Sequence, residues 1–215
     1  MSIYSEEKSA RLRKAIFYEN HAEIKSLLMD PEVDLEARFR GYTPFCLVCN
    51  WSDPSIVRMF LDCERHIDYN AKTTCRESLT AIEISAEDLQ MFEMLVNDPR
   101  IDVNVGSKGR ALLRHIGRYY HVLQKTKILL ACERFDPHFT AEDCTIETVY
   151  QLSVNGPFHS VPAYREGVDL IKAYVQDPAA VREQLRRELG CPEYRAAELF
   201  ATVVLACDGY YEIKD

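Results

Sequence analysis

Hydrophobic and polar positions recur along this chain with a period of 34 residues. Four aspartates stand one period apart, each after an apolar or aromatic residue: Asp34 after Val33, Asp68 after Ile67, Asp102 after Ile101 and Asp136 after Phe135. Upstream, apolar pairs keep a second register, at Leu27-Leu28, Leu95-Val96 and Leu129-Leu130, with Phe60-Leu61 one residue early. Two registers with this period predict a stack of helix pairs, in which each unit buries its apolar face against its neighbours.

The spacing within one period predicts its two helices. Residues 6–19 carry apolar positions at helical spacing with charged residues between them. After Asn20-His21, which turns the chain, Ile24 and the Leu27-Leu28 pair form the apolar stripe of a second helix. This helix ends at Asp30-Pro31, because a residue before proline is driven out of the helical region.

The second unit carries the most specific motif. It runs from Gly41-Tyr42-Thr43-Pro44-Phe45 through Ile56–Leu61 to Ile67-Asp68-Tyr69-Asn70-Ala71. Gly41 allows a turn, Thr43 can cap the following helix, and Pro44 occupies the first helical position, where no donor is missed. With these residues the sequence resembles the ankyrin repeat family over about residues 6–139, and to 153 with a partial fifth unit. The resemblance implies an all-α solenoid of four to five helix-pair repeats that binds a protein partner through its hairpin fingers and concave face.

The period stops near residue 153, where Gly156, Pro157 and Pro162 interrupt the chain. A helical stripe follows up to Asp177-Pro178, which predicts a cap followed by the start of another helix. A third stretch, Ala196–Cys207, is apolar nearly all round and must be buried. We therefore expect a repeat domain over residues 1–153 and a helical cap over residues 163–215, packed on the last repeat.

Composition and charge exclude several classes of protein. With 215 residues and 47% hydrophobic residues, the chain can bury a proper core. A formal net charge of −8 argues against an uncompensated nucleic-acid surface. The longest apolar run, Ala201–Cys207, falls far short of the roughly 18 residues that a membrane span needs. The polar, acidic N-terminus does not match a signal or transit peptide, and the eight cysteines are typical of reduced thiols. We expect a monomer located in the cytoplasm or the nucleus.

One pattern is compatible with a metal site. Cys46-x2-Cys49 followed by Cys63-x2-His66 has the ligand types and pair spacing of a zinc site. The rival interpretation treats these cysteines as small hydrophobic residues of the core, because Cys49 stands where the ankyrin family buries an alanine. We favour the second interpretation and expect no bound metal and no cofactor.

Nothing in the sequence assembles a catalytic set. Histidines are scattered, and no local motif places one beside a cysteine nucleophile. Neither a phosphate-cradling glycine loop nor a paired-carboxylate motif is present. We therefore expect a protein that is not an enzyme.

Charge placement suggests a binding surface. The segments between repeats contain six basic residues against two acidic ones, Glu36 and Glu77. The basic residues are Arg38, Arg40, Lys72, Arg76, Lys108 and Arg110. Stacking of repeats would place successive fingers side by side, so that these charges form one basic row facing an acidic protein partner. The alternative is that loops are polar without further function.

Aromatic residues lie beside this row. Trp51 ends the first helix of the second repeat, a helix that lines the concave face in ankyrin proteins, and tryptophan is a favoured interface anchor. Phe39 and Tyr42 on the adjoining finger would extend the same surface. Packing of Trp51 against a neighbouring repeat is the rival interpretation.

These observations predict a non-catalytic scaffold that binds a protein partner, acidic in character. The alternative is an adaptor that recruits a substrate while its C-terminal helices dock onto larger machinery such as a ubiquitin ligase.

Overall fold

The computed structural model describes residues 3–75, 78–107, 110–112, 121–136 and 162–191. Within these ranges the helices and strands comprise α-helices, one 3-10 turn and a single pair of two-residue strands, which confirms the expected all-α class. The helices are α1 (Ile3–Phe17), α2 (His21–Met29), α3 (Pro44–Trp51), α4 (Pro54–Leu61), α5 (Ala81–Ile84) with the 3-10 turn η1 (Ser85–Glu87), α6 (Leu89–Asn97), α8 (Val122–Ala131), α10 (Pro162–Gln176) and α11 (Pro178–Glu188). The strands β1 (Gly106–Ser107) and β2 (Arg110–Ala111) pair antiparallel, with Gly106 opposite Ala111.

Most helices begin at a side-chain cap. Thr43 accepts a hydrogen bond from the backbone N–H of Cys46 at 3.2 Å, and Pro44 occupies the first position of α3, which confirms the expected start of this helix. The same arrangement of an acceptor side chain followed by proline starts α4 at Asp53 and α11 at Asp177. Local sequence therefore fixes where these helices begin.

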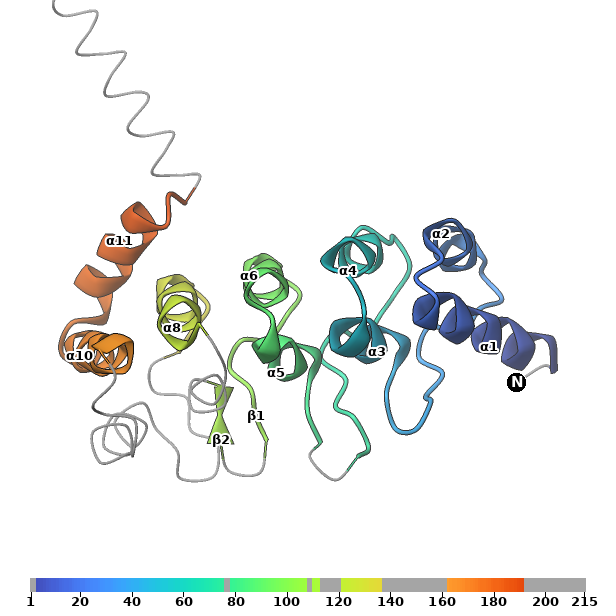
Figure 1. Ribbon diagram of the computed structural model, residues 1–215, viewed down its shortest axis with the longest axis horizontal. Helices are drawn as coiled ribbons and strands as arrows, with labels where there is room; N and C mark the ends of the chain where they lie inside the picture. Colours follow the sequence, from blue (N-terminus) through green and yellow to red (C-terminus); the bar gives the residue numbers. More distant parts are fainter. Residues whose placement is uncertain (1–2, 76–77, 108–109, 113–120, 137–161, 192–215) are drawn as a thin grey trace, which may run out of the picture.

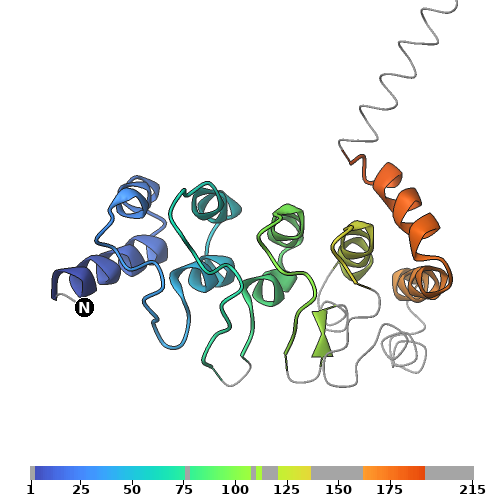
Figure 2. The same ribbon diagram turned by 180° about the vertical axis from the view of Figure 1, so that it is seen from behind.

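The helices form two layers. In Figure 1, α2, α4, α6 and α8 lie side by side in one layer, while α1, α3 and α5 lie in the other. Figure 2 shows the same row from behind. The loops that join successive helix pairs project from the layer of α1, α3 and α5, away from the other layer (Figure 1). We call these loops fingers: residues 30–43 form the first and residues 62–80 the second.

Hydrophobic side chains of both registers fill the space between the layers. Phe45, Phe60 and Phe92 are fully buried, and Leu61 and Leu129 are 5% and 0% exposed. The repeated apolar pairs of the sequence are therefore the core, as a stack of amphipathic helices requires.

Polar side chains link each unit to the next with nearly the same period. Asn70 Oδ1 accepts from the backbone N–H of Asp102 at 2.8 Å, and Asn104 Oδ1 accepts from the N–H of Asp136 at 2.8 Å. In the first unit Glu36 takes this position, and its Oε1 accepts from the N–H of Asp68 at 2.8 Å. Three of the four periodic aspartates, Asp68, Asp102 and Asp136, thus lie at the junctions between units.

Helices α10 and α11 pack against α8 at the end of the row opposite α1 (Figures 1 and 2). Tyr174 is fully buried, with its ring centroid 6.2 Å from that of Phe135. Lys127 of α8 pairs with Glu188 of α11 at 2.7 Å and with Glu166 of α10 at 3.4 Å. The partial fifth unit expected within residues 139–152 and the apolar stretch 196–207 lie outside the described residues.

No helix in the described part of the chain is both long enough and apolar enough to cross a bilayer.

Candidate partner-binding surface

Four aromatic side chains form a continuous row across the first two units. The rings of Phe17 and Trp51 stack, with centroids 5.3 Å apart and an interplanar angle of 26°. The Tyr42 ring packs against Trp51, with the two centroids 5.7 Å apart. The Phe39 ring meets Phe17 edge-on, with centroids 6.4 Å apart and an interplanar angle of 89°. We call Tyr42, Trp51, Phe17 and Phe39 the aromatic row. Such offset and edge-on pairs are the favoured geometries of aromatic rings.

The row follows from the period of the chain. Phe17 and Trp51 are 34 residues apart and are the last residues of α1 and α3, so stacking of the two units brings their rings together. Tyr42 and Phe39 belong to the tip of the first finger, where they form an antiparallel bridge through hydrogen bonds of 2.8 and 3.0 Å.

The finger tip requires glycine at position 41. Gly41 has a φ of +87°, and a Cβ at this position would lie 2.8 Å from Thr74 Oγ1 of the second finger. The backbone N–H of Thr74 also donates to the carbonyl of Gly41 at 2.9 Å. The close approach of the two fingers therefore depends on the missing side chain.

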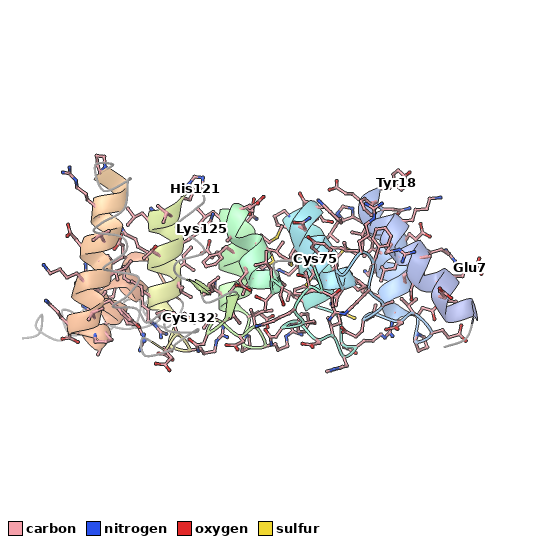
Figure 3. The ribbon with its side chains drawn as sticks, turned by 90° about the horizontal axis from the view of Figure 1, so that it is seen from below. Glu7, Tyr18, Cys75, His121, Lys125 and Cys132 are labelled. Atoms are coloured by element: carbon pink, nitrogen blue, oxygen red, sulfur yellow. The ribbon has the colours of Figure 1, made fainter. Side chains whose placement is uncertain are left out.

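A large part of the aromatic row faces solvent. Phe17 is 52% exposed and Trp51 is 48% exposed, although a tryptophan ring normally buries most of its surface. Tyr18, the next residue after α1, is 75% exposed. Figure 3, seen from the side of the fingers, labels Tyr18 along the same long edge of the stack as His121. Trp51 therefore packs on the neighbouring unit, and about half of its surface remains exposed.

Two arginines flank the row. The guanidinium carbon of Arg13 lies 4.6 Å from the centroid of the Phe39 ring, and that of Arg40 lies 5.3 Å from the same centroid. A guanidinium that stacks on a ring is held in place by the ring while its N–H groups can still donate at its edge. Arg13 and Phe17 lie one helical turn apart on α1.

Two of the expected basic residues also connect successive units of the row. Arg38 donates from Nη1 to the carbonyl of Lys72 at 2.8 Å, and Lys72 Nζ donates to the carbonyl of Gly106 at 3.4 Å. Each donor reaches a carbonyl 34 residues further along the chain. Since both side chains remain exposed, they combine a structural contact with a positive charge at the surface.

The structure brings Arg38, Arg40 and Lys72 together on adjoining fingers. Arg76 and Lys108 lie outside the described residues. Arg110 is described only through its backbone, in β2.

Three other arginines are used for structure. Arg65 donates to the carbonyl of Asp30 at 2.6 Å, Arg100 to that of Leu61 at 2.6 Å, and Arg134 to that of Val96 at 2.5 Å. These carbonyls end the helices α2, α4 and α6, where a positive charge also interacts favourably with the helix dipole. These three arginines are not among the six basic residues that the sequence predicted for binding.

The cysteine and histidine pattern does not form a cluster. Cys46 and Cys49 are buried in α3, and burial raises the pKa of both thiols. Cys63 follows the end of α4, where its Sγ donates to the carbonyl of Leu28 at 3.8 Å, and His66 is exposed. Among the described residues, no three His, Cys, Asp or Glu side chains come close enough to hold a metal ion.

Phe17 and Arg13 are not among the residues that the sequence predicted for this surface. Phe17 stands one 34-residue period before Trp51, and this spacing is the signal that predicts their contact. Arg13 has no comparable signal, because its position depends on how α1 crosses the first finger.

Comparison with models of known protein families finds no match for this chain, and no curated protein is similar to it in sequence.

Proposed function

We propose that this chain is an ankyrin-repeat solenoid that serves as a non-catalytic scaffold and binds a protein partner through its first two fingers and the adjoining ends of α1 and α3. Two layers of paired helices, fingers on one side and contacts that recur every 34 residues support the ankyrin assignment. In this proposal α10 and α11 are the cap that covers the apolar end of the row.

The aromatic row is the observation that carries the proposed function. Half-exposed Trp51 and Phe17 side chains are costly to leave in water, and tryptophan, tyrosine and arginine dominate the energetics of protein interfaces. Exposed contiguous apolar surface beside charged residues is typical of an interaction site. The cations of the fingers would accelerate association with an acidic partner and would be screened as salt rises.

The test is quantitative binding of a partner isolated by pull-down, with Trp51→Ala as the diagnostic change. We expect Trp51→Ala to weaken binding by at least about 2 kcal/mol, which is roughly 30-fold, because a central aromatic anchor is lost. Met29→Ala is the matched control, since Met29 is 75% exposed but ends α2 in the other layer.

The electrostatic half is tested with charge reversal of Arg38, Arg40 and Lys72 at low and high salt. Because Arg38 and Lys72 also link the fingers, a variant with glutamine at all three positions separates lost charge from reversed charge. Binding that ignores salt, this triple change and Trp51→Ala would place the site elsewhere. A partner that is lost when exposed residues of α10 or α11 are substituted in the folded full chain would instead support the adaptor function.

A further inference from the structure

The two arginines at Phe39 are close together and unneutralised within the described structure. Both guanidinium carbons lie near one ring centroid, at 4.6 and 5.3 Å, so they are at most about 10 Å apart. In the part of the chain that the structure describes, neither Arg13 nor Arg40 forms an ion pair with a carboxylate, whereas Arg11 on the same helix pairs with Glu23. Two like charges within about 10 Å repel each other, and an anion bound beside either of them lowers that repulsion.

The donors at this position favour a carboxylate as the anion. Phosphate sites commonly use free backbone N–H groups at helix starts or loop nests. Here the N–H groups of Phe39 and Tyr42 are bonded to each other's carbonyls across the finger tip. The position therefore offers side-chain guanidinium groups rather than a nest of free backbone N–H groups. A guanidinium fork pairs with a carboxylate and with a phosphate alike, and a phosphoserine peptide distinguishes the two.

An apolar platform lies a short distance from the arginines. The exposed stack of Phe17 and Trp51 begins 6.4 Å from the Phe39 ring, measured between the centroids of Phe17 and Phe39. An extended peptide rises about 3.3 Å per residue, so two residues span about 6.6 Å, and side chains at positions i and i+2 point to the same face. One extended segment can thus place an apolar side chain on the stack and a carboxylate beside the Phe39 ring, where the guanidinium carbons of Arg13 and Arg40 lie 4.6 and 5.3 Å from the ring centroid.

We propose that the partner presents an extended, acidic, unphosphorylated peptide segment in which a large apolar residue and an aspartate or glutamate are two positions apart. The apolar residue packs on Phe17 and Trp51, and the carboxylate binds Arg13 and Arg40. Further acidic residues of the segment continue towards Arg38 and Lys72. The inference rests on the proposed function and specifies the chemistry of the partner.

The experiment is selection of random 12-residue peptides displayed on phage against the full chain. We expect the enriched peptides to carry Asp or Glu two positions from an aromatic or aliphatic residue, in either direction. Selection that enriches no peptide, or peptides without this pair, overturns the inference.

The leading peptide is then synthesised with a fluorescent label and its affinity is measured by anisotropy. Arg13→Gln with Arg40→Gln should weaken binding at least tenfold, and Glu→Gln in the peptide should weaken wild-type binding equally while adding little to the double variant. Arg58→Gln is the matched control, an exposed arginine on α4. Thermal unfolding checks that each variant folds.

Two further results would overturn parts of the inference. Tighter binding of a peptide with phosphoserine in place of the acidic residue, by tenfold or more, overturns the carboxylate assignment. Unchanged affinity in the Arg13 and Arg40 double variant overturns the site. If a partner protein depends on Trp51 while no acidic peptide is selected, the inference fails and the proposed function stands.

Discussion

At the scale of single residues, the same kind of side chain has different roles depending on which unit surrounds it. Arg65, Arg100 and Arg134 satisfy helix-end carbonyls, whereas Arg13 and Arg40 rest on an aromatic ring. Charge counts along the sequence cannot separate these roles. The contacts that each arginine makes with the neighbouring unit separate them.

Glu36 differs from Asn70 and Asn104, the residues that take its place in the hydrogen bonds between later units. Asn70 and Asn104 each accept through Oδ1 and also donate through Nδ2, to the carbonyls of Arg100 at 2.9 Å and Arg134 at 2.7 Å. Glu36 can only accept when it is ionised, and burial raises the pKa of its carboxyl.

We predict that Glu36→Asn raises the free energy of unfolding by about 0.5–1 kcal/mol near pH 7, because a second hydrogen bond replaces a partly desolvated charge. A folded-state pKa above the ordinary value of 4.5 means that wild-type stability falls as pH rises from about 4.5 through the folded pKa. The advantage of the variant should therefore be small below pH 4.5 and complete above the raised pKa. Urea unfolding at several pH values measures this, with exposed Glu64→Gln as control. An advantage that does not change with pH would contradict the role given to the Glu36 charge.

At the scale of elements, local signals and packing agree for most helices. Helix α5 is the exception in length, with only Ala81–Ile84 before η1. It keeps a capping box in which Glu83 Oε2 accepts from the backbone N–H of Thr80 at 2.9 Å. Its burial in the row, rather than its propensity, holds so short a helix in place.

We predict that Leu61→Ala and Leu129→Ala each lower the free energy of unfolding by about 2–5 kcal/mol, since a buried leucine loses its transfer energy and leaves a cavity. Their exposed fractions of 5% and 0% place both in the core register. Chemical denaturation measures the loss. Met29→Ala, at 75% exposure, should stay within about 0.5 kcal/mol of wild type. If the leucine variants were as stable as that control, the assignment of the periodic apolar pairs to the core would be wrong.

At the scale of the whole molecule, the row of units has two open ends, and α10 with α11 covers one of them. The contact combines buried Tyr174, Val181 and Leu185 with the ion pairs of Lys127. In a stack whose units contact only their neighbours, the last unit depends on such a cover.

We predict that removal of residues 162–215 causes aggregation or a clear fall in the denaturant midpoint, because the apolar face of α8 is left in water. Light scattering and denaturant unfolding measure the two outcomes. Tyr174→Ala in the full chain is a milder version that keeps α10 and α11 present. A soluble truncated protein with an unchanged midpoint would show that these helices are an independent module.

The sequence by itself determined the helical class, the 34-residue period, the helix starts at Thr43 and Asp53 and the core positions, because caps, prolines and apolar spacing act within one unit. It also identified Trp51, Phe39 and Tyr42 as residues of one surface. Only the tertiary structure decided that Phe17 stacks on Trp51, that Arg13 of α1 contacts the Phe39 ring, and that Arg38 and Lys72 link neighbouring units. These contacts join residues of different units, and their geometry depends on how the units stack, which no local pattern encodes.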